Sequence, residues 1–191
     1  MVTLNRIYTR TGDAGTTRLA TGEPVSKAGP RIEANGAVDE ANACIGLART
    51  HLSADPELDV MLARIQNELF DLGADISTPA KPDEAEGSVL RVLDSQVARL
   101  EAEIDVLNER LPPLASFVLP GGTPAAAALH LARTVCRRAE REAVRLIEAD
   151  EPVSGPALRY LNRLSDFLFV AARWANGQGG SEVFWKSGAT R

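Results

Sequence analysis

Residues 123–150 read TPAAAALHLARTVCRRAEREAVRLIEAD, and this stretch decides the fold. Thr123 is a favourable N-cap and Pro124 a favourable first helical residue, so the pair predicts where a helix begins. At about 100° per residue, the apolar side chains gather on one side of that helix. The stretch therefore predicts a long helix ending near Asp150, with an apolar face made of Ala132, Val135, Cys136, Ala139, Ala143, Leu146 and Ile147.

Four other segments share this helical periodicity. They are residues 31–52, 56–76, 94–111 and about 155–176. Asp55-Pro56 caps the start of the second, Pro112-Pro113 stops the third, and Asn176-Gly177 ends the last. Long helices joined by short connections bury their apolar stripes by packing side by side. We therefore predict an all-α fold, a five-helix up-and-down bundle.

One domain covering residues 1–191 is the expected organisation, since a chain of this length with 45% hydrophobic residues can bury one core. Its predicted parts are an extended N-terminal ligand-binding loop (1–30), the helical bundle (31–176) and a C-terminal tail (177–191). Within the bundle, residues 77–87 contain prolines and charges, which favours an exposed loop, and residues 114–119 favour an extended segment.

The net charge of −5 argues against a general nucleic-acid surface, so no nucleic-acid partner is expected. The N-terminus has no apolar signal segment and no apolar run approaches the ~20 residues that span a bilayer, so we expect no membrane association and a cytoplasmic location. The two cysteines, Cys44 and Cys136, are expected in helices as small core residues of a reducing compartment.

The segment from Tyr8 to Arg18 reads YTRTGDAGTTR and is almost free of apolar side chains. Its glycines allow backbone N–H groups to converge on an anion, and its threonines add hydroxyl donors. Its arginines add guanidinium groups that can make bidentate hydrogen bonds to phosphate. A polyphosphate is the ligand that these groups suit. The alternative is a polar N-terminus without a ligand. No P-loop and no G-x-G-x-x-G motif is present, so neither common phosphate-binding arrangement applies.

The 123–150 helix also carries a row of basic side chains. Arg133, Arg137, Glu140 and Arg141 fall in one sector opposite the apolar face, flanked by Arg138 and Arg145. One interpretation is a solvated face with i,i+3 and i,i+4 pairs worth only ~0.2–0.5 kcal/mol each. The other is a site for an anion or for a second subunit, which would relieve the repulsion between the arginines.

The last predicted helix is apolar over most of its circumference, with a narrow polar stripe that contains Asn162 and Asp166. These two side chains either bond to neighbours or face a ligand site. The only histidines, His51 and His130, are not preceded by Glu at three residues, so a ferritin-like di-iron centre is not expected.

Five segments, taken together and in order, resemble the PduO-type ATP:cob(I)alamin adenosyltransferases (corrinoid adenosyltransferases). They span nearly the whole chain and are Tyr8–Thr17, Ala37–Glu40, Phe117–Gly122, Cys136–Arg141 and Tyr160–Asp166. The resemblance implies a cobalamin adenosyltransferase-like bundle that works as a homotrimer with sites between subunits. It also implies transfer of the 5′-deoxyadenosyl group of ATP to the cobalt of cob(I)alamin, with triphosphate as the second product.

The resemblance further implies roles for individual residues. ATP and its Mg²⁺ would be held by Thr9, Arg10, Thr11, Gly12, Asp13, Gly15, Thr16, Thr17, Arg18, Lys27, Arg137, Arg138, Glu140, Arg141 and Asn162. On the cobalamin side or at a subunit interface would lie Asp39, Arg133 and Asp166, with Phe117 beneath the cobalt. No protein ligand for the magnesium is assigned, since ATP carries it. Ala14 stands where the family often has glycine or lysine.

Cob(I)alamin is itself a strong nucleophile, which fits the lack of an obvious nucleophile and general base in the sequence. The catalytic set that the resemblance implies is Arg137, Arg138, Glu140 and Phe117, which would align ATP, stabilise the leaving triphosphate and make cobalt reducible. A flavoprotein reductase and a cobalamin-dependent acceptor enzyme are the expected protein partners. Two alternatives are a non-catalytic sensor or delivery protein that binds ATP or adenosylcobalamin, and an ATP-dependent phosphotransferase.

Overall fold

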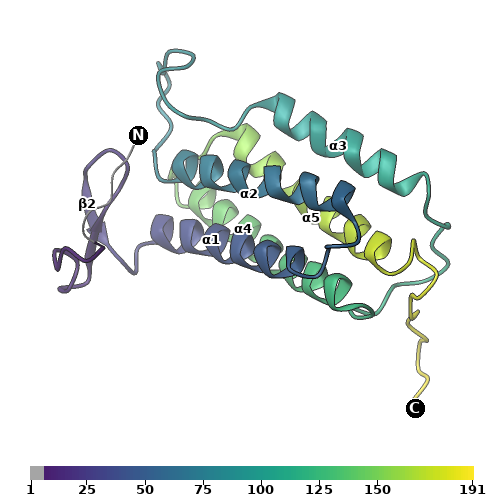
Figure 1. Ribbon diagram of the computed structural model, residues 1–191. Coiled ribbons are helices and arrows are strands. Elements are labelled where there is room, and N and C mark those ends of the chain that lie inside the picture. The colour runs from purple at the N-terminus through teal and green to yellow at the C-terminus, as the bar shows by residue number, and fades with distance from the viewer. Residues whose placement is uncertain (1–6) are drawn as a thin grey trace.

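The computed structural model describes residues 7–191, which form a helical bundle with a small β-hairpin at one end (Figure 1). The five helices are α1 (Pro30–Arg49), α2 (Pro56–Ile76), α3 (Asp94–Asn108), α4 (Pro124–Glu148) and α5 (Gly155–Ala175). The hairpin consists of β1 (Thr16–Arg18) and β2 (Pro24–Ser26), paired antiparallel. The predicted all-α five-helix fold is confirmed, and the hairpin is an element that the sequence patterns did not predict.

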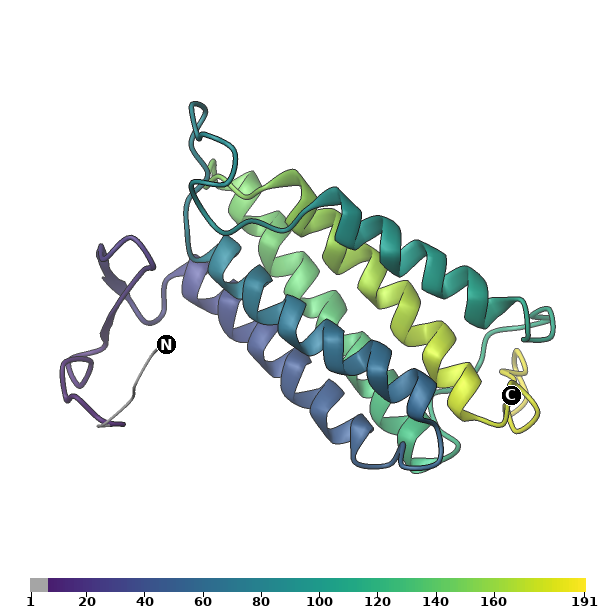
Figure 2. The same cartoon turned by 45° about the horizontal axis from the view of Figure 1, so that its top comes forward.

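The decisive helix α4 lies between α1 and α5, while α2 packs on α1 and α3 packs on α5. Successive helices run in opposite directions, so α1, α3 and α5 all begin at the end where the hairpin projects (Figure 2). The C-terminal tail lies at the opposite end, with the segment that precedes α4. The two ends of the bundle thus carry different groups of the predicted site residues.

Helix starts follow the sequence signals. The Asp55 carboxylate accepts a hydrogen bond from the Leu58 amide at 3.1 Å, and the Thr123 hydroxyl accepts one from the Ala126 amide at 3.2 Å. These are the N-caps expected from the Asp-Pro and Thr-Pro pairs. Ser154 caps α5 in the same way, through the Ala157 amide.

Two helices end earlier than predicted. The helix predicted over 31–52 ends at Arg49, because residues 50–52 form i→i+3 turns. In one of them, the His51 amide donates a hydrogen bond to the Ala48 carbonyl. The helix predicted over 94–111 ends at Asn108 for the same reason. Helix α4 ends at Glu148, and Asp150 has a left-handed φ of 58° that a helix cannot continue.

One core runs the length of the bundle and draws on all five helices. Its largest fully buried side chains include Tyr160 and Phe167 of α5. The predicted apolar face of α4 is buried at Ala132, Cys136, Ala139, Ala143 and Leu146. Cys136 is a core residue as expected, whereas Cys44 is only half-buried. Among residues 7–191, none of the helices is long and apolar enough to span a bilayer.

The connection between α2 and α3 is exposed, as predicted, but it is also tied down by Arg91. The Arg91 guanidinium binds the Glu84 carboxylate, the buried Asp75 carboxylate and the Thr78 carbonyl at 2.6–2.8 Å. Asp75 also accepts the Ser154 hydroxyl at 2.7 Å, which links α2 to the start of α5. These carboxylates raise the pKa of Arg91, so its charge is fixed at all relevant pH values.

Candidate functional site

The N-terminal segment folds into a hollow of about 600 Å³ at the hairpin end of the bundle. All but one of the residues predicted there to bind ATP line this hollow: Thr9, Arg10, Thr11, Gly12, Asp13, Thr16, Thr17, Arg18 and Lys27. Tyr8 and Pro24 complete the wall. Gly15, the remaining predicted residue, lies in the turn behind it with a φ of 84°, a conformation that glycine adopts without strain.

The hairpin explains how Lys27 reaches residues far from it in sequence. Strand β1 pairs with β2 so that Thr16 lies opposite Ser26, and the Lys27 amide donates to the Gly15 carbonyl at 2.9 Å. A Cβ atom at Gly12 would lie 2.9 Å from the Lys27 Nζ. The hollow therefore brings Lys27 against the glycine turn, and a side chain at position 12 would displace it.

Arg10 is held in an unusual conformation beside this hollow. Its φ of 64° lies in the left-handed region, which costs an arginine roughly 1 kcal/mol. Its guanidinium lies 5.5 Å from the centroid of the Tyr8 ring, a cation–π contact that offsets part of this cost. Left-handed non-glycine residues gather at ligand-binding sites more than elsewhere.

The arginines of α4 divide into a paired and an unpaired group. Arg138 binds the Glu40 carboxylate of α1 and lies 3.9 Å from that of Glu33, and Arg145 pairs with Glu142. In the part of the chain that the structure describes, Arg133, Arg137 and Arg141 have no carboxylate partner. We call these three residues, spaced four apart on one side of the helix, the arginine row.

The arginine row carries uncompensated positive charge. The only side-chain hydrogen bond within it runs from Arg141 to the Arg137 carbonyl, at 3.0 Å. Burial, and secondarily the nearby Arg137, lower the pKa of Arg133. A surface ion-pair network would have placed carboxylates beside these groups. The row is therefore suited to bind a polyanion or the carboxylates of another chain.

The polar stripe of α5 lies next to this row. The Asn162 amide donates to the Glu140 carboxylate at 2.8 Å, and Asp166 pairs with Arg163 at 3.1 Å. Both Asn162 and Asp166 are exposed, so they bond to neighbours at the surface and not inside the core. The Asn162 contact fixes Glu140, the single carboxylate set among the arginines of the row.

Asp39 lies on another part of the molecule, in a groove of about 500 Å³ between the hairpin, α1 and α2. Its carboxylate has no ion-pair partner within residues 7–191. Arg18, Phe70 and the buried Asn42 also line the groove. The groove thus presents an unpaired carboxylate, as the arginine row presents unpaired guanidiniums.

Phe117 lies at the opposite end of the bundle, before α4, and 78% of its surface is exposed. It is therefore not a core phenylalanine. Its ring makes an edge contact with Trp185 of the tail, with 6.1 Å between centroids. Because Phe117 lies at the opposite end of the bundle from the hollow and Asp39, the predicted site residues do not form one closed pocket among residues 7–191.

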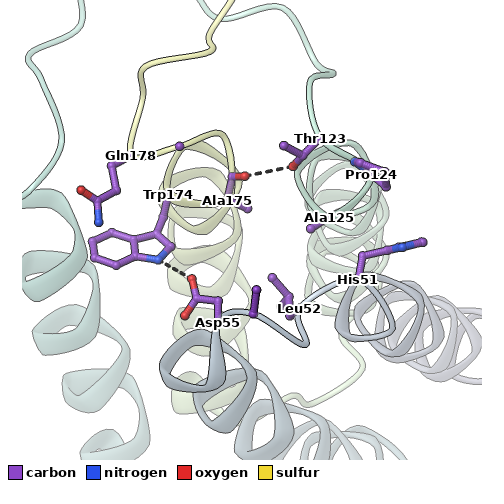
Figure 3. A pocket seen from close by; sticks show the side chains of 11 residues that line it. His51, Leu52, Asp55, Thr123, Pro124, Ala125, Trp174, Ala175 and Gln178 are labelled. Carbon is purple, nitrogen blue, oxygen red and sulfur yellow. Dashed lines mark hydrogen bonds between the residues drawn. The ribbon is translucent and has the colours of Figure 1, made fainter.

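A further cavity of about 700 Å³ opens at the same end as Phe117 (Figure 3). Its wall includes His51, Asp55, Thr123 and Trp174. Asp55 accepts a 2.6 Å hydrogen bond from the Trp174 indole, and the Thr123 hydroxyl donates to the Ala175 carbonyl at 2.9 Å. These polar groups are already bonded to each other, so they join the ends of α2, α4 and α5. None of the ATP-site or cobalamin-site residues predicted from the sequence lines this cavity.

Residues 7–175 match the family model of cobalamin adenosyltransferase. The chain is 49% identical over 191 residues to a corrinoid adenosyltransferase of Mycobacterium tuberculosis, covering 100% of this chain and 97% of the relative. It is 42% identical over 178 residues to a corrinoid adenosyltransferase of Bacillus subtilis, covering 92% and 89% of the two chains.

Solved structures agree with this match. A phenylalanine-to-histidine variant of the PduO-type ATP:corrinoid adenosyltransferase of Lactobacillus reuteri, complexed with cobalamin and ATP, superimposes with a TM-score of 0.87. It is 37% identical and covers 95% of this chain and 97% of its own. An arginine-to-lysine variant of that protein complexed with ATP gives a TM-score of 0.85 at 39% identity, covering 95% and 100%.

The match of fold, length and sequence defines the class as an adenosyltransferase of helical-bundle architecture. The chain belongs to the cobalamin adenosyltransferase family, which confirms the family and the ATP-dependent corrinoid adenosyltransferase activity predicted from its motifs.

Proposed function

We propose that this adenosyltransferase joins cobalt to the C5′ carbon of ATP and releases inorganic triphosphate. The observation that carries the proposal is the arginine row of α4, three guanidiniums without carboxylate partners in the described chain, together with the phosphate-suited hollow of the N-terminal hairpin. In this reaction the electron pair of Co(I) forms the Co–C bond as the C5′–O bond breaks, and the pair of that bond leaves on triphosphate.

The hollow and the row divide the work of holding ATP. The backbone of the glycine turn, the threonine hydroxyls and Lys27 suit phosphate oxygens in the hollow. Arg137 and Arg141 are suited to stabilise the negative charge that develops on the triphosphate as it leaves. Arg138 would have to release Glu40 before it could bind phosphate, so we assign to it chiefly the fixing of α4 against α1.

Magnesium would enter with ATP. Mg²⁺ in phosphate-transfer sites is commonly held by one or two carboxylates together with the phosphates. Glu140 is the carboxylate next to the row, and Asn162 fixes one of its oxygens at 2.8 Å, which leaves the other for the ion or its waters. The residues present therefore fit a nucleotide-borne Mg²⁺, which would draw charge from the leaving group.

The site is completed by a second copy of the chain in this proposal. Arg133 and Asp39 are oppositely charged, and neither has an ion-pair partner among residues 7–191. A cyclic trimer would pair each Arg133 with the Asp39 of a neighbour, and it would bring the row of one subunit to the groove of the next. Cobalamin would then lie between subunits, with Asp166 beside that interface.

Cobalt must be Co(I) to attack, and the cobalamin that reaches the enzyme as Co(II) must gain an electron. An apolar ring under cobalt displaces the lower axial ligand and makes that reduction easier. Phe117, with its apolar ring exposed, suits this task. A flavoprotein reductase as electron donor and a cobalamin-dependent enzyme as acceptor of the product complete the proposal.

The test is Phe117→Ala assayed in two ways. We expect a much larger loss of turnover when Co(II)alamin must be reduced on the enzyme than when Co(I)alamin is supplied, because the ring acts before the attack. Phe167→Leu, a conservative change at a buried ring, is the control for general packing. Equal losses in both assays would refute the assignment of Phe117 to the reduction step.

A further inference from the structure

The C-terminal segment 173–185 is bonded at three places to the segment 112–123 that carries Phe117. These contacts lie at the end of the bundle away from the hairpin. No ligand is needed to form them, because each is made by groups of this one chain. The tail is therefore part of the structure that determines where Phe117 lies.

The first contact is a buried ion pair at the base of the tail. Arg173 and Glu182 join at 2.6 Å with side chains only 3% and 0% exposed. Arg173 also donates to the Pro112 carbonyl at 2.7 Å, at the start of the Phe117 segment. The chain at Gly179 passes so close to Pro112 that a Cβ atom there would lie 2.8 Å from the proline ring. Burial makes this pairing costly to break.

The second contact fixes the turn between Phe117 and α4. The buried Asn176 side chain accepts from the Thr123 amide at 2.9 Å and donates to the Gly121 carbonyl at 3.0 Å. Gly122, between them, has a φ of 104°, and any side chain at that position would overlap Asn176. The turn after Phe117 is thus held by the residue that ends α5.

The third contact is at Phe117 itself. The Trp185 amide donates to the Phe117 carbonyl at 2.8 Å, and the Leu119 amide donates to the Val183 carbonyl at 2.8 Å, around a β-bridge between Val118 and Phe184. The Phe117 and Trp185 rings meet edge to face at 65°. Trp185 is the one aromatic partner of Phe117 among residues 7–191.

We infer that Trp185 is a positioning residue for Phe117, and that the tail holds the Phe117 ring where cobalt is to be reduced. The inference rests on the proposed function, since it assumes the role given to Phe117. A ring that is 78% exposed has no core around it to select one rotamer. The edge contact with the Trp185 ring favours one rotamer of Phe117. The two backbone hydrogen bonds fix the position of the backbone that carries Phe117.

The test compares Trp185→Ala with Trp185→Phe, which keeps a smaller ring, and with Val183→Ala, which removes another exposed apolar side chain of the tail. The first readout is the fraction of ATP-bound Co(II)alamin that becomes four-coordinate, measured by electron paramagnetic resonance. The second is turnover from Co(II)alamin with a reductant against turnover from supplied Co(I)alamin.

We expect Trp185→Ala to lower the four-coordinate fraction and to slow the Co(II) route by roughly tenfold to a hundredfold, the usual effect of a misplaced group. Turnover of supplied Co(I)alamin should stay close to that of the unaltered protein. Trp185→Phe should fall between, and Val183→Ala should change neither readout.

Two results would overturn the inference while leaving the proposed function intact. One is a normal four-coordinate fraction in Trp185→Ala while Phe117→Ala loses it. The other is an equal loss on both routes, which would mean that Trp185 acts only on general structure. By contrast, if Phe117→Ala itself keeps a normal four-coordinate fraction, the role proposed for Phe117 is what fails.

Discussion

Replacing Arg137 by alanine separates catalysis from folding in this enzyme. Arg137 has no carboxylate partner in residues 7–191, and its side chain is exposed, so its removal leaves no buried charge unpaired. Surface changes of this kind usually alter the free energy of unfolding by no more than ~0.5 kcal/mol. Burial is the larger cause that lowers the pKa of Arg133, and removing the Arg137 charge relieves the smaller cause, the repulsion between the two guanidiniums. We therefore expect unchanged or slightly higher stability.

The effect of Arg137→Ala on turnover should be large. A preorganised donor aimed at developing negative charge contributes about 10²–10³ in kcat, or about 2.7–4 kcal/mol. The assay follows adenosylcobalamin formation by absorbance, with Co(I)alamin supplied and ATP saturating, so that neither cobalt reduction nor weak ATP binding limits the rate. Thermal unfolding of the same preparation measures stability.

Arg145→Ala is the matched control for this experiment. It removes the same residue type from the same helix, where the exposed Arg145 side chain pairs with the largely buried carboxylate of Glu142. Losing that i,i+3 pair affects stability, which thermal unfolding reports, whereas turnover should not change. The reasoning would be refuted if Arg137→Ala kept near-normal kcat, or if Arg145→Ala lost as much activity as Arg137→Ala.

Three other changes test the fold around the sites. Gly122→Ala should destabilise the turn after Phe117 and slow cobalt reduction, since a Cβ atom overlaps Asn176 and φ is 104°; unchanged reduction kinetics and melting temperature would contradict this. His130 is buried, neither of its ring nitrogens has a hydrogen-bond partner among residues 7–191, and burial lowers its pKa below 6.5, so the folded state favours the neutral ring. Stability should therefore fall as pH drops from 6.5 toward the lower folded pKa, and His130→Leu should abolish that part of the slope in denaturant titrations; an unaltered slope would assign it to other groups. Arg91→Met leaves the fully buried Asp75 without its cation and should cost about 3–5 kcal/mol in urea unfolding, whereas a loss under ~1 kcal/mol would show that the Arg91 contacts are dispensable.

The bundle could be predicted from sequence because its signals are local. Thr123-Pro124 and Asp55-Pro56 mark helix starts through side chains that act on the next turn, and the structure has those caps. The helix ends at Arg49 and Asn108 were harder to predict, since the residues that follow them keep the apolar spacing while the backbone tightens into i→i+3 turns.

The hairpin was not predicted, because strands of three residues have too little alternation to recognise. Gly22, with a φ of 86° between the strands, was the available turn signal. The division of the α4 arginines was also beyond the sequence. Arg137 and Arg138 are neighbours in the sequence, and both are arginines of the same helix. Only the packing of α1 against α4 shows that Glu40 pairs with Arg138 and not with Arg137. The attachment of the tail to Phe117 depends on contacts between residues far apart in the chain.

In the proposed reaction, the arginine row and the hollow hold a triphosphate that leaves intact while cobalt takes the adenosyl group. The most direct measurement is product analysis after incubation of the protein with ATP, Mg²⁺ and Co(I)alamin. We expect adenosylcobalamin and inorganic triphosphate in equal amounts, with no ADP. Formation of ADP would indicate a phosphotransferase, and binding of both ligands without any product would indicate a sensor or delivery protein; either result would rule out adenosyl transfer by this site.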